Sequence, residues 1–134
     1  MRIVIDTNIV ASAIFFGGRP RELLELLLQH ELSAFVTQEI IDEYQGTIEY
    51  LQSKYPSRRI TTPLTQIIAA CNMISATTKV KVCRDPDDDK FLTCALDSRS
   101  LYIVSGDKDL LTVKEFDDIQ IVTVSQFFSD VWKD

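Results

Sequence analysis

Short apolar runs alternate with segments of helical periodicity along this chain of 134 residues. The runs are rich in β-branched side chains, which favour strands. Strands that alternate with helices form parallel β-α-β units, because a parallel connection is long enough to hold a helix. The pattern therefore predicts an α/β fold. We expect strands at residues 2–5, 34–36, 101–104 and 120–124, and a weaker one at 80–82.

Helical periodicity and capping residues define the segments between the strands. Thr37 is placed to cap one helix, and Asp85 followed by Pro86 supplies a cap with proline at the first helical position. Ser125 is placed to cap a last helix that carries several aromatic residues. We expect the other helices at residues 20–29, 38–52, 64–75 and 87–97.

Length and composition suit one domain with its own core, since 46% of the residues are hydrophobic. The connection at 53–63 holds two prolines, but neither side of it is long enough to fold alone. We therefore expect a single domain over residues 1–134. The first residues show no signal-peptide pattern, and no apolar run approaches the roughly 20 residues of a membrane span, so we expect a cytoplasmic protein.

The cysteine and histidine content argues against a zinc site. Cys71, Cys83 and Cys94 show no C-x-x-C spacing, and His30 is the single histidine. Zinc sites usually take several Cys or His ligands. We interpret the cysteines as reduced and mostly packed, and His30 as a cation that suits the end of a leucine-rich helix.

The formal net charge of −6 is the main objection to nucleic-acid binding through a broad basic surface. A negative net charge is compatible with nucleic-acid binding if the carboxylates gather at one place and divalent cations neutralise them there. Scattered basic residues usually form only a solvated surface, so contact with RNA phosphates stays open for Arg58, Arg59, Lys79, Lys81 and Arg84.

Acidic residues lie where the predicted sheet would bind a ligand. Asp6 and Asp107 follow the predicted strands at 2–5 and 101–104. Asp89 lies in the first turns of the helix that follows the weaker strand at 80–82. Open parallel sheets bind their ligands outside the carboxyl ends of the strands. Glu43 lies in the middle of a predicted helix beside its apolar face, and it could close the same crevice from one side.

Such a gathering of carboxylates indicates a metal site. The carboxylates repel one another, and without a counter-ion at least one of them would hold a proton. With no histidine or thiolate cluster at hand, oxygen ligands favour Mg²⁺ or Mn²⁺ over zinc. These ions activate water and polarise phosphodiesters in metal-dependent nucleases. The acids therefore indicate phosphodiester hydrolysis.

Three segments resemble the signature motifs of PIN-domain proteins. They are residues 4–8 (Val-Ile-Asp-Thr-Asn), 85–92 (Asp-Pro-Asp-Asp-Asp-Lys-Phe-Leu) and 104–111 (Val-Ser-Gly-Asp-Lys-Asp-Leu-Leu). The resemblance covers nearly the whole chain. Within the family, the segments most resemble the VapC-like toxin components of toxin–antitoxin pairs. It implies a PIN-like three-layer α/β/α fold with a central parallel sheet of about five strands. It also implies an endoribonuclease that cleaves single-stranded RNA with Mg²⁺ or Mn²⁺ and leaves 5′-phosphate and 3′-hydroxyl ends.

The resemblance assigns metal-binding and catalytic roles by motif position. Asp6 matches the first family acid, Glu43 the helical glutamate and Asp107 the last acid. Asp89 matches the third acid, because it is the member of the Asp run that is followed three residues later by the aliphatic Leu92. These four residues are the metal ligands that we expect.

Further residues stay open at this point. Asp88 is an alternative third ligand or the partner of the Asp85 cap, and Asp109 either contacts the metal or caps a short helix. The resemblance implies that side chains hydrogen-bonded to the ligands orient them. These side chains are Thr7 or Asn8, and Ser105, which stands where threonine is usual in the family.

Partners and alternative functions follow from the same residues. The predicted helix at 20–29 carries five leucines on more than one face, which suits a homodimer or an antitoxin-binding groove. One alternative function is a catalytically silent PIN-like module that binds RNA or protein. Another is a phosphoacceptor signalling domain with an acidic Mg²⁺ pocket. That class needs paired acids after the first strand, whereas Thr7 and Asn8 follow Asp6 here.

Overall fold

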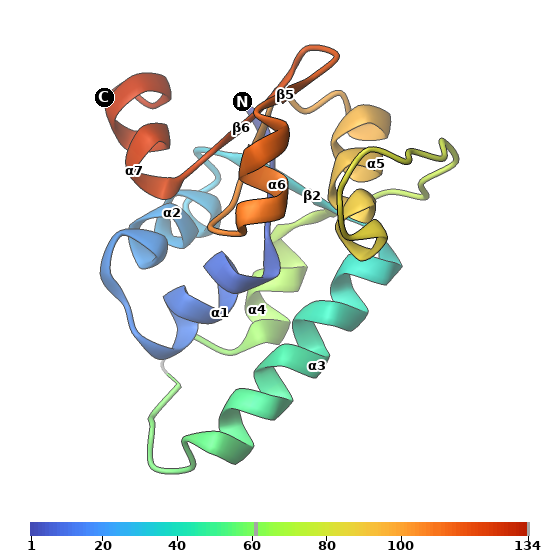
Figure 1. Cartoon of the computed structure of the whole chain (residues 1–134). Helices are drawn as coiled ribbons and strands as arrows, with labels where there is room; N and C mark the ends of the chain where they lie inside the picture. The colour runs from blue at the N-terminus through green and yellow to red at the C-terminus, as the bar shows by residue number, and fades with distance from the viewer. Residues whose placement is uncertain (61, 134) are drawn as a thin grey trace.

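A computed structural model describes residues 1–60 and 62–133 of the chain (Figure 1). Its central sheet has the strand order β3-β2-β1-β4-β6-β5, and all neighbouring strands pair in parallel except β5, which is antiparallel to β6. The predicted α/β fold with a mostly parallel sheet is confirmed. The strands are β1 (Arg2–Ile5), β2 (Ser33–Val36), β3 (Asn72–Met73), β4 (Tyr102–Val104), β5 (Glu115–Phe116) and β6 (Ile119–Val122).

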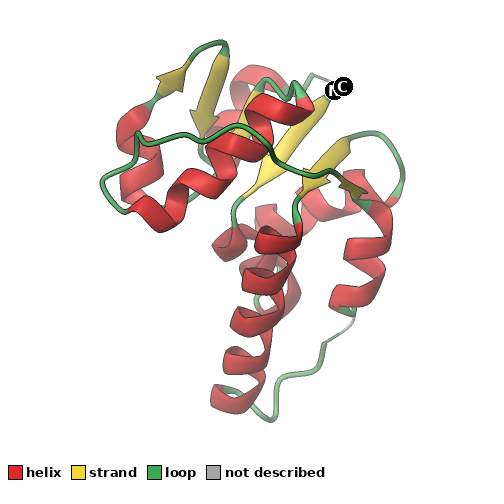
Figure 2. Cartoon of the chain, turned by 90° about the vertical axis from the view of Figure 1, so that its right-hand side faces the viewer, coloured by secondary structure: helices red, strands yellow, loops and turns green. Residues whose placement is uncertain are grey.

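The central strands are buried on both faces, as expected for the middle layer of three. Ile3, Val4 and Ile103 are fully inaccessible to solvent, and helices lie on both sides of the strands (Figure 2). Two short edge strands, β3 and β5, were not predicted, because two residues are too few to show a periodicity. The weak strand expected at 80–82 is absent, and these residues form an irregular loop.

Most helices lie close to the predicted positions. The first two residues of the helix predicted at 87–97 belong to a 3₁₀ turn that begins at Pro86, and the helix predicted at 64–75 ends early because the chain continues into β3. The helices are α1 (Thr7–Phe15), α2 (Gly18–Leu28), α3 (Gln38–Lys54), α4 (Leu64–Ala70), α5 (Asp89–Ser98), α6 (Lys108–Val113) and α7 (Val124–Gln126), with a 3₁₀ turn at Pro86–Asp88 and a π-helical turn at Phe127–Val131.

Helix α1 was missed because it is buried on nearly every side. Seven of its nine residues are buried, so it lacks the polar stripe by which an amphipathic helix is recognised. It packs against α2 and α3. The five leucines of α2 are all buried or half-buried within this chain. Their apolar character is thus accounted for by packing inside the molecule.

The predicted caps are partly confirmed. Thr37 accepts a hydrogen bond from the backbone N–H of Ile40 at 3.2 Å, and the Asp85 side chain caps the 3₁₀ turn that Pro86 begins. The prediction for Ser125 is wrong. Thr123 and Gln126 form a reciprocal capping box two residues earlier, and its paired hydrogen bonds satisfy two backbone donors.

Two strand ends are held side by side at one edge of the sheet. The backbone N–H of Asp6 donates to the carbonyl of Val104 at 2.9 Å, and the Tyr44 hydroxyl on α3 donates to the carbonyl of Ile5. The residues that follow β1 and β4 therefore emerge next to each other, with α3 fixed against them. None of the helices among the described residues combines the length and hydropathy that a bilayer crossing demands.

Candidate metal centre

Asp6 lies directly after β1 and is buried, with 4% of its surface exposed. Its Oδ2 accepts a hydrogen bond from the Ser105 hydroxyl at 2.7 Å, and the Ser105 oxygen in turn accepts one from the backbone N–H of Asp107 at 2.9 Å. Ser105 therefore connects the ends of β1 and β4. The backbone N–H of Thr7, the first residue of α1, also donates to the Asp6 carboxylate and lowers its pKa.

Three further acids meet beside Asp6. One carboxylate oxygen each from Asp88, Asp107 and Asp109 lies within 4.8 Å of the other two, an arrangement that could hold a metal ion. Asp107 also caps α6, because its Oδ1 accepts from the backbone N–H of Asp109 at 2.7 Å. The cap uses one oxygen of Asp107 and fixes the orientation of the other.

The electrostatics of these acids show how closely they are grouped. Burial raises the pKa of Asp6 to about 6, and the charges of Asp107 and Glu43 add to the rise, although the hydrogen bond from Ser105 opposes it. Burial raises the pKa of Asp88 to about 7, and Asp107 is the largest charge that contributes. Two carboxyl groups thus resist ionisation near neutral pH, which is the penalty that a divalent cation would remove.

Asp89 lies outside this group of acids. Its Oδ1 accepts hydrogen bonds from the backbone N–H groups of Val82 and Cys83, at 3.1 and 2.7 Å. Neighbouring residues on a helical backbone point about 100° apart, so Asp88 and Asp89 leave the chain in different directions. The structure brings Asp88 to Asp107 and uses Asp89 to hold the preceding loop, in contrast to the expectation that favoured Asp89.

Glu43 borders the acids, but both of its oxygens have partners. Its Oε2 accepts from the Thr7 hydroxyl, and its Oε1 lies 2.7 Å from the Nζ of Lys90. The same Nζ lies 3.0 Å from Asp87 Oδ1. Burial lowers the pKa of Lys90, but the contacts with Glu43 and Asp87 outweigh it and leave the pKa above its usual value. The buried ammonium therefore stays charged.

Comparison with known proteins shows the family to which the chain belongs. The model of the family described as PIN domain matches residues 2–109. The chain belongs to the PIN-domain family. The uncharacterized protein MJ1680 of Methanocaldococcus jannaschii is 30% identical over 122 residues, which cover 86% of this chain and 76% of the relative.

A solved structure shares the fold of this PIN domain. It is a chain of the crystal structure of VapBC2 from Rickettsia felis bound to a DNA fragment from their promoter. The TM-score is 0.58 at 16% sequence identity, and the match covers 90% of this chain and 97% of the other. At this identity the likeness concerns the fold alone. It agrees with the three-layer architecture that the sequence predicted.

The contacts of this PIN domain separate the predicted site residues into three sets. Asp6, Asp107 and the two alternatives Asp88 and Asp109 come together, as described above. Ser105 and Thr7 donate hydrogen bonds to Asp6 and Glu43, which is the position expected of orienting groups. The third set comprises Asn8, which is exposed, and Asp89, whose Oδ1 accepts a hydrogen bond from the loop.

Sequence reasoning missed Lys90 and Tyr44. Tyr44 lies on the apolar face of α3, and its hydroxyl also fixes the end of β1. Lys90 is 9% exposed. The sequence signal for Lys90 was its position directly after three acids and directly before an aromatic residue, Phe91. A lysine that is buried at such a position needs anionic partners.

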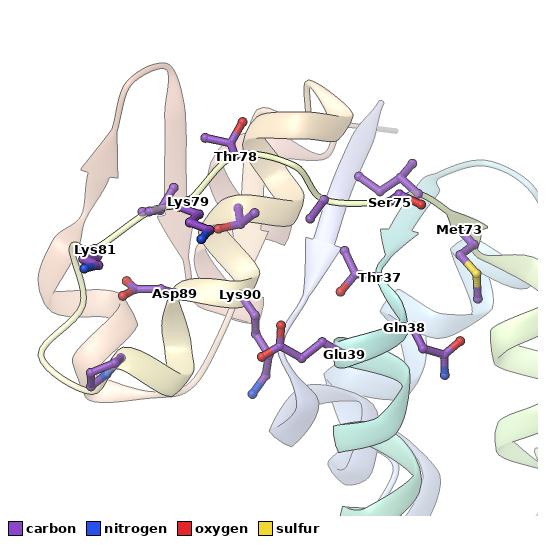
Figure 3. A pocket seen from close by; sticks show the side chains of 15 residues that line it. Thr37, Gln38, Glu39, Met73, Ser75, Thr78, Lys79, Lys81, Asp89 and Lys90 are labelled. Carbon is purple, nitrogen blue, oxygen red and sulfur yellow. The ribbon is translucent and has the colours of Figure 1, made fainter.

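A groove of about 650 Å³ runs beside the acids of this PIN domain (Figure 3). One wall is the start of α3, with Thr37 and Gln38, and the other is the loop that carries Lys79 and Lys81. Lys90 also lines the groove. The groove therefore reaches Pro86 and Asp89, the residues on either side of the Asp87-Asp88 pair.

Proposed function

We propose that this PIN domain is an endoribonuclease that hydrolyses single-stranded RNA with the help of Mg²⁺ or Mn²⁺. The observation that carries the proposal is the group of Asp88, Asp107 and Asp109, whose carboxylate oxygens lie within 4.8 Å of one another, together with Asp6, whose charge acts on Asp88. These four residues would hold the metal. Asp88 replaces Asp89 as the third ligand in this proposal, because an oxygen of Asp88 lies with those of Asp107 and Asp109, whereas Asp89 is absent from this group and its Oδ1 accepts from two backbone N–H groups of the loop.

The residues present fit a hard divalent cation. The donors in the site are carboxylate oxygens, which Mg²⁺ and Mn²⁺ prefer. Burial raises the pKa values of Asp6 and Asp88, and the charges of neighbouring acids add to the rise, so a divalent cation would favour the ionised form of both groups. When bound, the metal would supply charge stabilisation and an activated water for attack on a phosphodiester.

The chain's own residues prepare the site for this chemistry. Ser105 and the α6 cap fix the oxygens of Asp6 and Asp107 before any ligand arrives. Lys90 holds Glu43 in place and supplies a positive charge close to the acids. Because both oxygens of Glu43 are engaged, we assign Glu43 a supporting role in which it positions Thr7 and Lys90. Glu43 would bind the metal only if it gave up its contact with Thr7 or with Lys90.

A matched pair of variants tests the proposal. Asp88→Asn should abolish Mn²⁺-dependent cleavage of single-stranded RNA, whereas Asp89→Asn should keep most of it, because the amide oxygen of the new side chain can still accept from the loop. Asp6→Asn should be inactive as well. Equal loss in Asp88→Asn and Asp89→Asn, with both variants folded, would contradict the assignment. Full activity in Asp6→Asn would contradict the proposed function itself.

We also propose that the nuclease is the toxin of a toxin–antitoxin pair, is bound by an antitoxin protein and forms a homodimer. The fold neighbour belongs to a VapBC2 assembly, and exposed aromatic rings at the ends of α1 and α3 offer a surface for a protein partner. Phe16 is 50% and Tyr50 is 62% exposed. Expression of the wild type in a bacterial host should arrest growth, and Asp6→Asn should not. Light scattering of the purified chain tests the dimer.

A further inference from the structure

The basic residues of this acidic chain are unevenly distributed. Residues 50–84 contain no Asp or Glu, although the chain has 20 of them. The same stretch contains six basic residues, so its formal charge is +6 and the remainder of the chain carries −12, which together give the net −6. The stretch includes the loop that forms one wall of the groove beside the acidic site.

Two carboxylates of α5 hold this loop at both ends. Asp97 accepts hydrogen bonds from the backbone N–H groups of Thr77 and Thr78, at 2.7 and 3.1 Å, and from the Thr78 hydroxyl at 2.6 Å. These bonds lower the pKa of Asp97, with the side-chain bond from Thr78 as the largest cause. Asp89 holds the other end through Val82 and Cys83. The backbone between the two anchors, residues 79–81, is therefore fixed on α5.

The anchored loop presents Lys79 and Lys81 at the groove. Both residues are exposed and line it, and Figure 3 shows them on the wall opposite the start of α3. None of the described ion pairs involves either lysine. The anchored backbone thus places both lysines at the groove, and among the described residues no ion pair neutralises them.

The lining of the groove suits a nucleotide strand. Ile74, Val80 and Pro86 provide apolar surface on which a base can lie, and Gln38 and Thr93 provide hydrogen-bonding groups. The volume of about 650 Å³ lies in the range of small-molecule sites. Two acids, Asp89 and Glu39, line the groove. Asp89 holds the loop, whereas Glu39, at the start of α3, makes none of the loop contacts described above.

We propose that Lys79 and Lys81 bind the sugar-phosphate backbone of single-stranded RNA in this groove, next to the acidic site, and that Asp97 and Asp89 position them. This inference rests on the proposed function. Charge complementarity selects the occupant, because two unpaired cations on an acid-free stretch attract phosphate, and the acidic remainder of the chain repels it elsewhere.

Binding of a fluorescent single-stranded RNA to the Asp6→Asn variant tests the inference without cleavage. Adding Lys79→Ala and Lys81→Ala should weaken the Kd roughly tenfold, and it should reduce the slope of log K against log salt by about 1.4, at about 0.7 per phosphate contact of a single strand. Glu39→Gln should tighten binding. Arg19→Ala with Lys133→Ala removes two cations outside the groove and should leave the Kd unchanged.

Asp97→Ala tests the positioning role of the anchor. It keeps both lysines but frees one end of the loop, so RNA binding should weaken while the melting temperature stays close to that of the parent. Asp97→Asn keeps one acceptor oxygen and should recover part of the affinity. Unchanged binding in Asp97→Ala would overturn the positioning role.

The outcomes separate this inference from the proposed function. If the wild type cleaves RNA and the Lys79→Ala, Lys81→Ala variant binds as tightly as its parent, the groove assignment is overturned and the nuclease stands. The groove assignment is also overturned if the Arg19→Ala, Lys133→Ala control weakens binding equally, because the loss of affinity would then follow from net charge alone. If the wild type neither binds nor cleaves RNA with Mn²⁺ present, the proposed function fails first.

Discussion

Lys90 is a charged residue whose burial depends on partners from other parts of the fold. Its ammonium lies between Glu43 of α3 and Asp87 of the 3₁₀ turn, at 2.7 and 3.0 Å. A buried cation of this kind is tolerated only when anions satisfy it. The pairing also keeps Glu43 from adding a further uncompensated charge to the acids around Asp6.

Replacing Lys90 with methionine should destabilise the protein. Lys90→Met preserves the length of the side chain but leaves Glu43 beside the other acids without its cation, and we expect a loss of about 2 kcal/mol. This is less than the roughly 3–5 kcal/mol of a fully buried pair, because Glu43 is partly exposed. Urea denaturation measures it. The double variant Lys90→Met, Glu43→Gln should regain most of the loss, and a single variant as stable as the wild type would refute the role.

The raised pKa values of Asp6 and Asp88 predict how stability depends on pH without metal. Both values, about 6 and about 7, lie above the usual 3.8, so the folded state binds more protons than the unfolded state between about pH 4 and pH 7. The free energy of unfolding should therefore fall as the pH rises through this window. Urea denaturation in a chelating buffer should show the fall, and Asp6→Asn should flatten it below about pH 6. A surface control, Asp118→Asn, should follow the wild type.

At the scale of elements, α1 and the 3₁₀ turn at Pro86–Asp88 decide how the site is built. Helix α1 begins directly after Asp6 and is enclosed by α2 and α3, which requires small residues where the helices approach. Ala11 and Ala13 are 4% and 1% exposed. The 3₁₀ turn, capped by Asp85, orients Asp88 toward Asp107 and leaves Asp89 as the first residue of α5.

Enlarging Ala13 should test the close packing of α1. Ala13→Leu adds three carbons to a filled interface and should cost about 1–3 kcal/mol of stability. Thermal melting measures the change. Ala69→Leu makes the same addition at an exposed position of α4 and should have a much smaller effect. Equal melting temperatures for Ala13→Leu and the wild type would show that α1 is loosely packed.

At the scale of the whole molecule, the strand order explains where the acids meet. From β1 the chain passes to β2 and β3 on one side of the sheet, and β4 and β6 then lie on the other side of β1. The connections diverge at β1 and β4, and such a switch point opens a crevice at the carboxyl ends of the strands. Asp6 and Asp107 lie at these two ends, and Asp88 arrives from the start of α5.

Metal binding at this crevice should stabilise the entire fold by mass action. With free Mn²⁺ at about 100 times its Kd, the wild type should gain about 2.7 kcal/mol, seen as a higher melting temperature. Asp6→Asn should start more stable without metal and gain less from it, because it removes one repelling charge and one ligand. Asp118→Asn should gain as much as the wild type. An identical gain in Asp6→Asn would place the metal elsewhere.

The sequence by itself determined the α/β class, four of the six strands, most helices and the positions of Asp6 and Asp107 after two of those strands. These features depend on local periodicity and on residues adjacent in the chain. Helix α1 escaped because a helix buried all around has no periodic polar face, and β3 and β5 escaped because pairing rather than composition defines such short strands.

Only the tertiary structure decided which member of the Asp run faces the site and which residues hold it there. Asp88 and Asp89 are chemically identical neighbours, and the difference arises from the turn that directs one to Asp107 and the other to the loop. The bonds that orient the site join residues far apart in the chain, with separations of 36 for Thr7 to Glu43 and 99 for Asp6 to Ser105. The motifs indicated Thr7 and Ser105 as orienting residues, but the pairing of each with its carboxylate forms only when the distant segments pack side by side.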